Sequence, residues 1–212
     1  MPAREHLLHK IRTALGRSAG QPVPAAPAAL LDLPPMDPGE RLSRMLERFP
    51  GQTFRAAGPA EARDHVAGLI GARRAVASPA PLLEQLGILA LPGVQAVSGE
   101  PAQVREACAA AEVGITTADY GLADTGALVA LAAGTESRLA SLLPPVHIAV
   151  LPADRILTGL GELFTILPDP GALSSSMVLI GGPSRTADIE QILTLGVHGP
   201  RELHLVCLVD QK

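Results

Sequence analysis

Residues 176–200 read SMVLIGGPSRTADIEQILTLGVHGP, and this stretch decides the fold that we expect. Its first part, residues 178–180, is a short apolar run with a β-branched bias, which predicts a strand covered on both faces. Gly181 and Gly182 permit a tight turn, and Pro183 fixes the exit from it. A buried strand that ends in a glycine-rich turn is typical of open α/β sheets.

The residues after this turn predict a helix with a candidate anion site at its N-terminus. Ser184 or Thr186 caps the helix, and its apolar side consists of Ile189, Ile192, Leu193 and Leu195. Unpaired N–H groups attract anions to such a terminus. The candidate ligand-binding residues there are Ser184, Arg185, Thr186 and Asp188. The alternative is a well-capped helix without a ligand, because Asp188 and Glu190 already satisfy the helix dipole and either can pair with Arg185. The glycine spacing matches neither G-x-G-x-x-G nor Walker A, so both interpretations stay open.

From Gln52 onward, segments typical of strands alternate with segments typical of helices. We expect strands at residues 53–56, 74–77, 87–91, 113–117, 127–132, 146–151, 176–181 and 203–209. We expect helices at residues 59–72, 79–86, 101–111, 160–167 and 184–195. This alternation predicts an α/β fold with an open, mainly parallel sheet and helices on both faces. Because residues 113–151 carry strands with little helix between them, we also expect a local antiparallel element there.

Residues 1–51 predict an N-terminal helical arm, followed by an α/β domain at residues 52–212. The arm begins with a basic amphipathic helix at residues 4–15, whose narrow apolar face favours docking on a partner or homo-oligomer formation over membrane binding. Residues 18–38 are rich in Pro and Ala, which predicts an extended linker.

A second helix is expected directly after the linker. Asp37 provides a cap, Pro38 suits the first helical position, and Glu40 completes the start pattern. Apolar residues follow at helical spacing, namely Leu42, Met45, Leu46 and Phe49. We expect this helix to pack on the main body and to end at Pro50.

The composition excludes several classes of function. Of the 212 residues, 47% are hydrophobic but only 2% are aromatic, which counts against a nucleic-acid module that stacks bases on aromatic rings. The formal net charge of −4 gives no general attraction to nucleic acid or to an anionic membrane. We find no signal-peptide core and no run of about 20 uncharged apolar residues. We therefore expect a cytoplasmic protein with no membrane span.

Cysteine usage bears on metals and redox groups. Cys108 and Cys207 are the only cysteines, and neither belongs to a C-x-x-C motif or to a zinc spacing. Two thiolates fall short of the set that usually holds an iron–sulfur cluster. Both side chains are interpreted as packing residues. We expect no metal site and no resident cofactor.

Residues 114–126, GITTADYGLADTG, form a second polar cluster at the ends of predicted strands. Reactive groups of α/β proteins gather at strand ends. Asp119 and Asp124 can act as an acid/base pair, orient a cationic substrate or hold a divalent ion. The alternative is that both cap turns, together with Thr125. We favour the turn for Asp124 alone and a site for Asp119 with Thr117.

A third cluster lies at residues 138–147. Arg138 can hold a carboxylate or phosphate with two hydrogen bonds. His147, at the start of an apolar strand, can be a general base or a ligand, although a structural hydrogen bond is the commoner role for a lone His. His198 is open to the same alternatives. Convergence of these His residues with Asp119 would permit a metal, but the spacing is not that of a closed zinc site.

These motifs resemble the lactate-utilisation protein C family, the LUD-domain proteins. The resemblance rests on GITTADYGLADTG, on R-x-x-S-L-L-P-P-x-H at residues 138–147, and on GGPSRTADIE followed by GVHGP. It implies an α/β sheet of the NagB/RpiA/CoA-transferase-like type. It places these residues on motif positions of the family: Thr117, Asp119, Asp124, Thr125, Arg138, His147, Ser184, Arg185, Thr186, Asp188 and His198.

Two functional hypotheses follow from the resemblance. The first is an accessory, cluster-free component of an L-lactate oxidation system, which binds a small anionic ligand and iron–sulfur partner proteins. The second is a free-standing enzyme on a sugar-phosphate or acyl-CoA substrate, with phosphate at Ser184–Thr186 and with Asp119 or His147 as the catalytic base. The second rests on analogy between folds.

Overall fold

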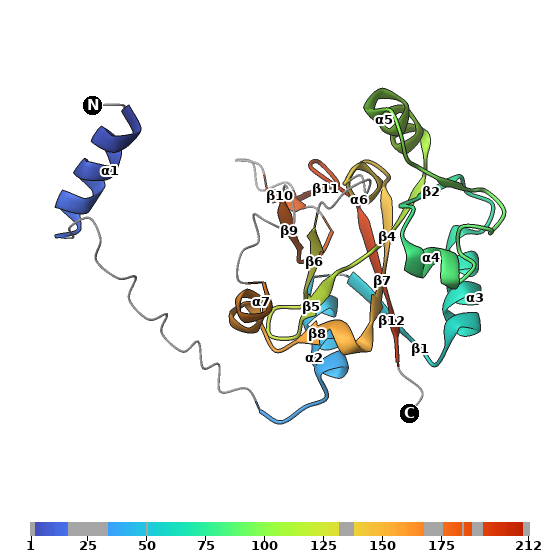
Figure 1. Ribbon diagram of the computed structural model, residues 1–212. Coiled ribbons are helices and arrows are strands. Elements are labelled where there is room, and N and C mark those ends of the chain that lie inside the picture. Colours follow the sequence, from blue (N-terminus) through green and yellow to red (C-terminus); the bar gives the residue numbers. More distant parts are fainter. Residues whose placement is uncertain are drawn as a thin grey trace. The chain divides into compact units, whose positions relative to one another are not determined.

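The computed structural model describes residues 3–16, 34–49, 51–131, 138–167, 176–183, 185–187 and 193–209. The chain divides into two compact units, Met1–Asp32 and Leu33–Lys212. The first contains helix α1 (Ala3–Ala14), drawn in blue in Figure 1. This helix buries none of its side chains and exposes the apolar residues Leu7 and Ile11. Among the described helices, none is long and apolar enough to cross a membrane.

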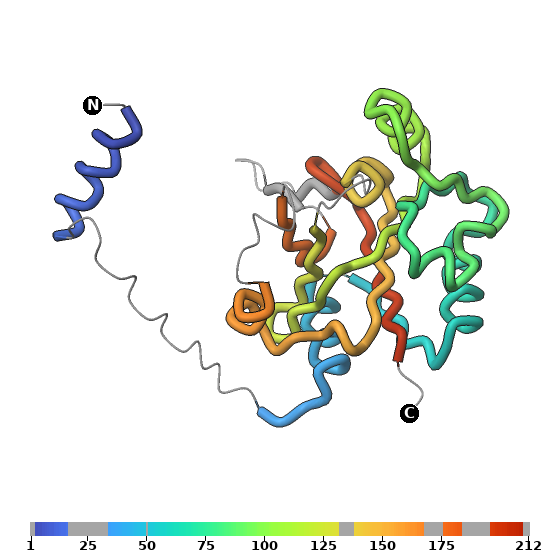
Figure 2. The backbone as a smooth tube through the Cα atoms, viewed as in Figure 1, coloured from blue at the N-terminus to red at the C-terminus, as the bar shows by residue number. Residues whose placement is uncertain are grey.

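The second unit is built on a six-stranded sheet in which all neighbouring strands run parallel. Its strands, in spatial order, are β1 (Gly51–Ala56), β12 (Glu202–Leu208), β7 (Val146–Pro152), β4 (Val113–Thr117), β2 (Ala75–Ala77) and β3 (Val94–Ala96). Figure 2 traces how β12, at the red end of the chain, lies between β1 and β7. The predicted parallel sheet is thus confirmed.

Helices cover both faces of this sheet, as predicted. Apolar residues of α3 (Pro59–Ile70) and α4 (Pro81–Gln85) pack on one face, where Ile148 and Val150 of β7 point. The other face, which carries Ala149 and Leu151, receives α2 (Pro38–Glu47). It also receives α5 (Pro101–Ala110) and α6 (Leu139–Leu142). The alternation of side chains along each buried strand explains why both faces need a cover.

A second sheet lies beside α2 on the same side of the six-stranded sheet (Figure 1). Its strands, in spatial order, are β8 (Ile156–Leu157), β5 (Tyr120–Leu122), β6 (Ala127–Leu131) and β9 (Met177–Ile180). β6 pairs antiparallel with both β5 and β9. The 3-10 helix η1 (Ala153–Arg155) and the helix α7 (Leu160–Ile166) flank β8. The local antiparallel element expected within residues 113–151 is thus confirmed.

Helix α2 begins as its sequence predicts. The Glu40 N–H donates to Oδ1 of Asp37 over 2.9 Å, and Pro38 occupies the first helical position. Leu42 and Leu46 of this helix are fully buried between the two sheets. The second compact unit, Leu33–Lys212, thus contains helix α2 as well as the two sheets.

Two predictions about residues 176–200 are wrong. The strand at 178–180 exists as β9, but it lies in the antiparallel sheet and Leu179 is 46% exposed, so it is not covered on both faces. The expected helix at 184–195 is replaced by β10 (Arg185–Ala187), paired antiparallel with β11 (Leu193–Leu195). Its apolar spacing fits a helix, but β-branched residues also suit paired strands, and pairing within the fold decides.

The prediction of a strand at residues 87–91 is also wrong. These residues form turns, and the edge strand β3 follows at Val94–Ala96. Gly87 and Gly93 both have positive φ, at 68° and 79°. Positive φ at both glycines is incompatible with a continuous strand from residue 87 onward.

Candidate functional site

A small pocket lies at the carboxyl edge of the parallel sheet, where Ala130 and Leu131 line it together with several polar residues. Side chains with hydroxyl, carboxylate or guanidinium groups line it: Ser78, Thr116, Thr117, Asp119, Arg138 and Ser141. Ser78 directly follows β2, and the two threonines end β4. Neighbouring parallel strands end at the same edge, which brings these residues together. The pocket volume is about 20 Å3, and we call it the inner pocket.

Asp119 is held at this pocket by the backbone of β6. Its N–H donates to the Val129 carbonyl over 2.8 Å, and its Oδ2 accepts from the Leu131 N–H over 2.7 Å. Burial raises the pKa of the Asp119 carboxyl, while the hydrogen bond from Leu131 and the charge of Arg155 act in the opposite direction. The carboxylate therefore has a fixed position and an increased proton affinity.

Two buried polar side chains stand at or behind the inner pocket. Ser78 is 2% exposed, and its Oγ has no hydrogen-bond partner among the described residues. His147 is 1% exposed, and its Nε2 lies 2.9 Å from Oγ1 of Thr116. Burial, with a smaller contribution from His204, lowers the pKa of His147 to about 4, so the ring is neutral at pH 7. His147 thus acts on the inner pocket through Thr116.

A larger cavity of about 350 Å3, here called the outer cleft, adjoins the inner pocket and shares Ala130, Arg138 and Ser141 with it. Leu142, residues 178–182 and residues 198–200 complete its lining. Oγ of Ser141 donates to the Arg138 carbonyl over 2.9 Å, which fixes the start of α6. The exposed Arg138 therefore borders both cavities.

A comparison with protein families decides the identity of the fold. The sequence model of the LUD domain matches residues 39–208. The chain belongs to the LUD domain family. The resemblance noted from the motifs is confirmed.

The chain is similar to several curated proteins, most of which are named for lactate utilisation. The chain is 33% identical over 159 residues to Lactate utilization protein C of Halalkalibacterium halodurans, and the match covers 71% of this chain and 69% of that protein. It is 38% identical over 117 residues to Lactate utilization protein C of an Exiguobacterium species, covering 53% and 51% of the two chains. It is 35% identical over 150 residues to the uncharacterized protein YkgG of Escherichia coli, covering 66% and 65%.

A solved structure shares the fold of this LUD domain. The crystal structure of a DUF162 family protein from Deinococcus radiodurans superimposes with a TM-score of 0.60 and 18% identity. The superposition covers 82% of this chain and 99% of that one. The shared fold extends over nearly all of that protein.

The structure brings some of the predicted site residues of the LUD domain together. Thr117, Asp119 and Arg138 line the inner pocket, and His198 lines the outer cleft. His147 lies behind Thr116 instead of lining a cavity wall. Within the described ranges, no three His, Cys, Asp or Glu side chains form a group that could hold a metal ion.

Other predicted site residues lie elsewhere. Asp124 and Thr125 lie in the turn between β5 and β6, where Asp124 N–H donates to the Thr158 carbonyl over 3.0 Å. Arg185 and Thr186 belong to strand β10, so the described residues of this segment do not form the helix N-terminus that was expected to bind an anion. Ser184 and Asp188 lie outside the described residues.

Three pocket residues were not among the candidate site residues named from the sequence, although two of them lie within the quoted motifs: Ser78, Thr116 and Ser141. The rule that strand ends carry functional groups would have selected Ser78 and Thr116, since each ends or follows a predicted strand. Ser141 lies on the short helix α6, whose contact with β4 depends on the absence of a side chain at Gly114, since a Cβ there would lie 1.8 Å from the Ala140 carbonyl oxygen.

Proposed function

We propose that this protein is an accessory component of an L-lactate utilisation system and binds a small carboxylate anion at Arg138. The observation that carries the proposal is that Arg138 lines both the inner pocket and the outer cleft, and shares the inner pocket with Ser78 and Thr116. The name Lactate utilization protein C of its relatives supports the metabolic role.

The chemistry of the site favours a carboxylate. A guanidinium group offers a planar fork of N–H donors that matches the two oxygens of a carboxylate. Ser78, which lines the inner pocket, carries a buried Oγ that lacks a hydrogen-bond partner in the described structure. Asp119 adds negative charge, so a ligand with one anionic group is preferred to a polyanion such as a phosphate ester.

The proposed role also assigns electron transfer to iron–sulfur partner proteins. Oxidation of lactate to pyruvate requires a group that accepts electrons. The chain has only Cys108 and Cys207, both buried, which fall short of the set of thiolates that usually holds a cluster. Burial raises the pKa of both thiols, which further disfavours them as ligands.

The alternative, a free-standing enzyme on a sugar-phosphate or acyl-CoA substrate, has less support. It required a phosphate at the N-terminus of a helix after Pro183, and strands β10 and β11 occupy those positions instead. Its second candidate base, His147, is buried behind Thr116. Asp119 alone remains as a pocket-lining base.

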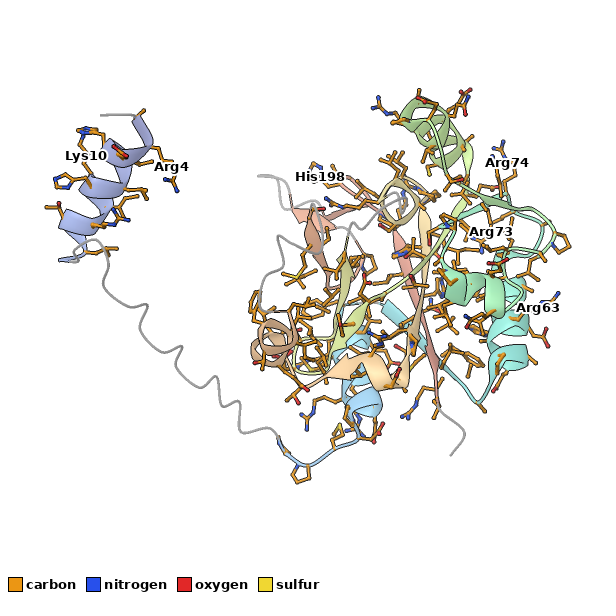
Figure 3. The ribbon with its side chains drawn as sticks, viewed as in Figure 1. Arg4, Lys10, Arg63, Arg73, Arg74 and His198 are labelled. Carbon is orange, nitrogen blue, oxygen red and sulfur yellow. The ribbon has the colours of Figure 1, made fainter. Side chains whose placement is uncertain are left out.

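Calorimetric titration of L-lactate, pyruvate and acetate into the full chain tests the ligand class. We expect Arg138→Ala to weaken binding at least tenfold. Arg63→Ala is the matched control, because Arg63 pairs with Asp64 on α3, across the sheet from His198 and the outer cleft (Figure 3). Unchanged affinity in folded Arg138→Ala would contradict the anion site.

A pull-down from cells grown on lactate tests the partner assignment. The tagged full chain should recover proteins that contain iron, as measured by iron and labile sulfide in the eluate. The same chain from cells grown on glucose is the control. If the chain is recovered without iron under conditions where lactate oxidation is active, the partner assignment is wrong.

A further inference from the structure

We propose that the site recognises 2-hydroxy carboxylates with an apolar side chain longer than the methyl group of lactate. The hydroxyl group enters the inner pocket, the carboxylate pairs with Arg138, and the side chain occupies the outer cleft. This inference rests on the proposed anion site and specifies its ligand.

The size of the inner pocket limits the group that enters it. Its volume is about 20 Å3. A cavity needs about 10–15 Å3 to hold one water molecule. This volume suits one hydroxyl-sized group.

The polar side chains of the inner pocket favour a hydroxyl group. Ser78 Oγ is buried without a partner and can donate, whereas the carboxylate of Asp119 accepts. A hydroxyl group both accepts and donates, so it satisfies Ser78 and Asp119 together. A carboxylate oxygen can only accept and is repelled by Asp119, and a methyl group leaves the buried Ser78 hydroxyl unpaired.

Arg138 fixes where the carboxylate lies relative to this hydroxyl. Arg138 lines both cavities, and its Nη1 lies 3.5 Å from Oγ of Ser176, so we place an anion bound to its guanidinium at the junction of the cavities. A ligand with its hydroxyl and its carboxylate on neighbouring carbons fits this placement. This arrangement is that of a 2-hydroxy acid, and it directs the remaining substituent into the outer cleft.

The outer cleft is larger and more apolar than a methyl group requires. Its volume of about 350 Å3 falls within the roughly 300–1,000 Å3 typical of small-molecule sites. Leu142, Val178, Leu179 and Ile180 contribute to its lining. Leu142 and Leu179 are 40% and 46% exposed, so a longer side chain would cover them. Each buried methylene strengthens binding roughly fourfold.

Titration of the full chain with four probes tests this inference. The probes are lactate, 2-hydroxybutyrate, 2-hydroxyisocaproate and 4-methylpentanoate, with both enantiomers of each hydroxy acid. We expect 2-hydroxyisocaproate to bind at least tenfold more tightly than lactate, with 2-hydroxybutyrate between them. We expect 4-methylpentanoate, which lacks the hydroxyl group, to bind at least tenfold more weakly than 2-hydroxyisocaproate.

Two variants assign the effects to their residues. Ser78→Ala should weaken 2-hydroxyisocaproate and leave 4-methylpentanoate unchanged, with Ser43→Ala on α2 as the matched control. Leu179→Ser should weaken 2-hydroxyisocaproate while lactate keeps its affinity. The inference is wrong if lactate binds as tightly as 2-hydroxyisocaproate, or if removal of the 2-hydroxyl group does not change the affinity. Either result would still agree with an anion site at Arg138. If no probe binds, both proposals fail.

Discussion

The Nε2 atom of His147 lies 2.9 Å from Oγ1 of Thr116, so a buried ring on β7 holds a hydroxyl group that lines the inner pocket. The parallel register sets up this contact, because Gly114 of β4 pairs with His147 and Thr116 follows two residues later on the same face. Nδ1 of the same ring has no partner in the described residues. The hydrogen bond to Thr116 therefore fixes the orientation of the His147 ring and the position of the Thr116 hydroxyl in the inner pocket.

Thr116→Val is expected to lower both stability and ligand affinity. The substitution keeps the shape of the side chain but leaves Nε2 of His147 buried without a partner, which costs about 1–3 kcal/mol. Urea unfolding measures this change. Thr165→Val is the control, because the Thr165 hydroxyl donates to the Gly161 carbonyl at an exposed site on α7. Equal stability of the two variants would show that the His147 contact contributes little.

Acidification is expected to destabilise the protein through His147. Its pKa is about 4 in the folded state against 6.5 for an ordinary His, so the unfolded chain binds the proton more tightly. Stability is therefore fully present above about pH 6.5 and is lost as the pH falls towards 4, by up to about 3 kcal/mol. Urea unfolding at several pH values between 7 and 4 measures the slope.

The His147→Gln variant is the comparison for this pH dependence. It should show a flatter profile over the same range, because His65, whose pKa is also lowered by burial, is present in both proteins and its effect cancels. Identical slopes for the two proteins would exclude His147 as the source of the acid sensitivity.

Asp119→Asn is expected to separate binding from stability. Because the folded-state pKa of Asp119 is raised, the folded protein binds the proton more tightly than the unfolded chain, and its stability falls as the pH rises through this carboxyl's titration. Asn removes the buried charge and still accepts from the Leu131 N–H. The melting temperature at pH 7 should stay equal or rise, while affinity for 2-hydroxy acids falls at least tenfold.

Asp154→Asn, at an exposed position of η1, is the control for this experiment. It should change neither the melting temperature nor the affinity. A clear loss of stability in Asp119→Asn alone would mean that the carboxylate stabilises the fold, and its assignment to ligand binding would lose support.

The sequence predicts the parts of the fold that depend on local pattern. Asp37 and Pro38 define the start of α2, and the apolar run that ends at Leu151 requires burial on both faces, so helices on both sides follow. The sequence predicts the fold less well where pairing between strands determines the structure. The apolar spacing of β10 and β11 fits a helix equally well. The candidate site shows the same difference between local pattern and strand pairing. Asp119 and Arg138 stand out by residue type. Ser78 and Thr116 can be selected only by their places at strand ends, and strand register then brings them to the same pocket as Asp119.

Close backbone contact at Gly114 is expected to be essential for the pocket. A Cβ at this position would lie 1.8 Å from the Ala140 carbonyl oxygen, which belongs to α6. Gly114→Ala must therefore displace α6 and with it Ser141 and Arg138, so we expect weaker ligand binding and a loss of stability at the upper end of about 1–3 kcal/mol. Gly68→Ala on α3 is the matched control, since nothing lies within 4 Å of the added Cβ, and it should stabilise the helix by about 0.5–1 kcal/mol. Urea unfolding and calorimetry on both variants measure the two effects, and a Gly114→Ala protein with normal stability and affinity would show that α6 can move without affecting the site.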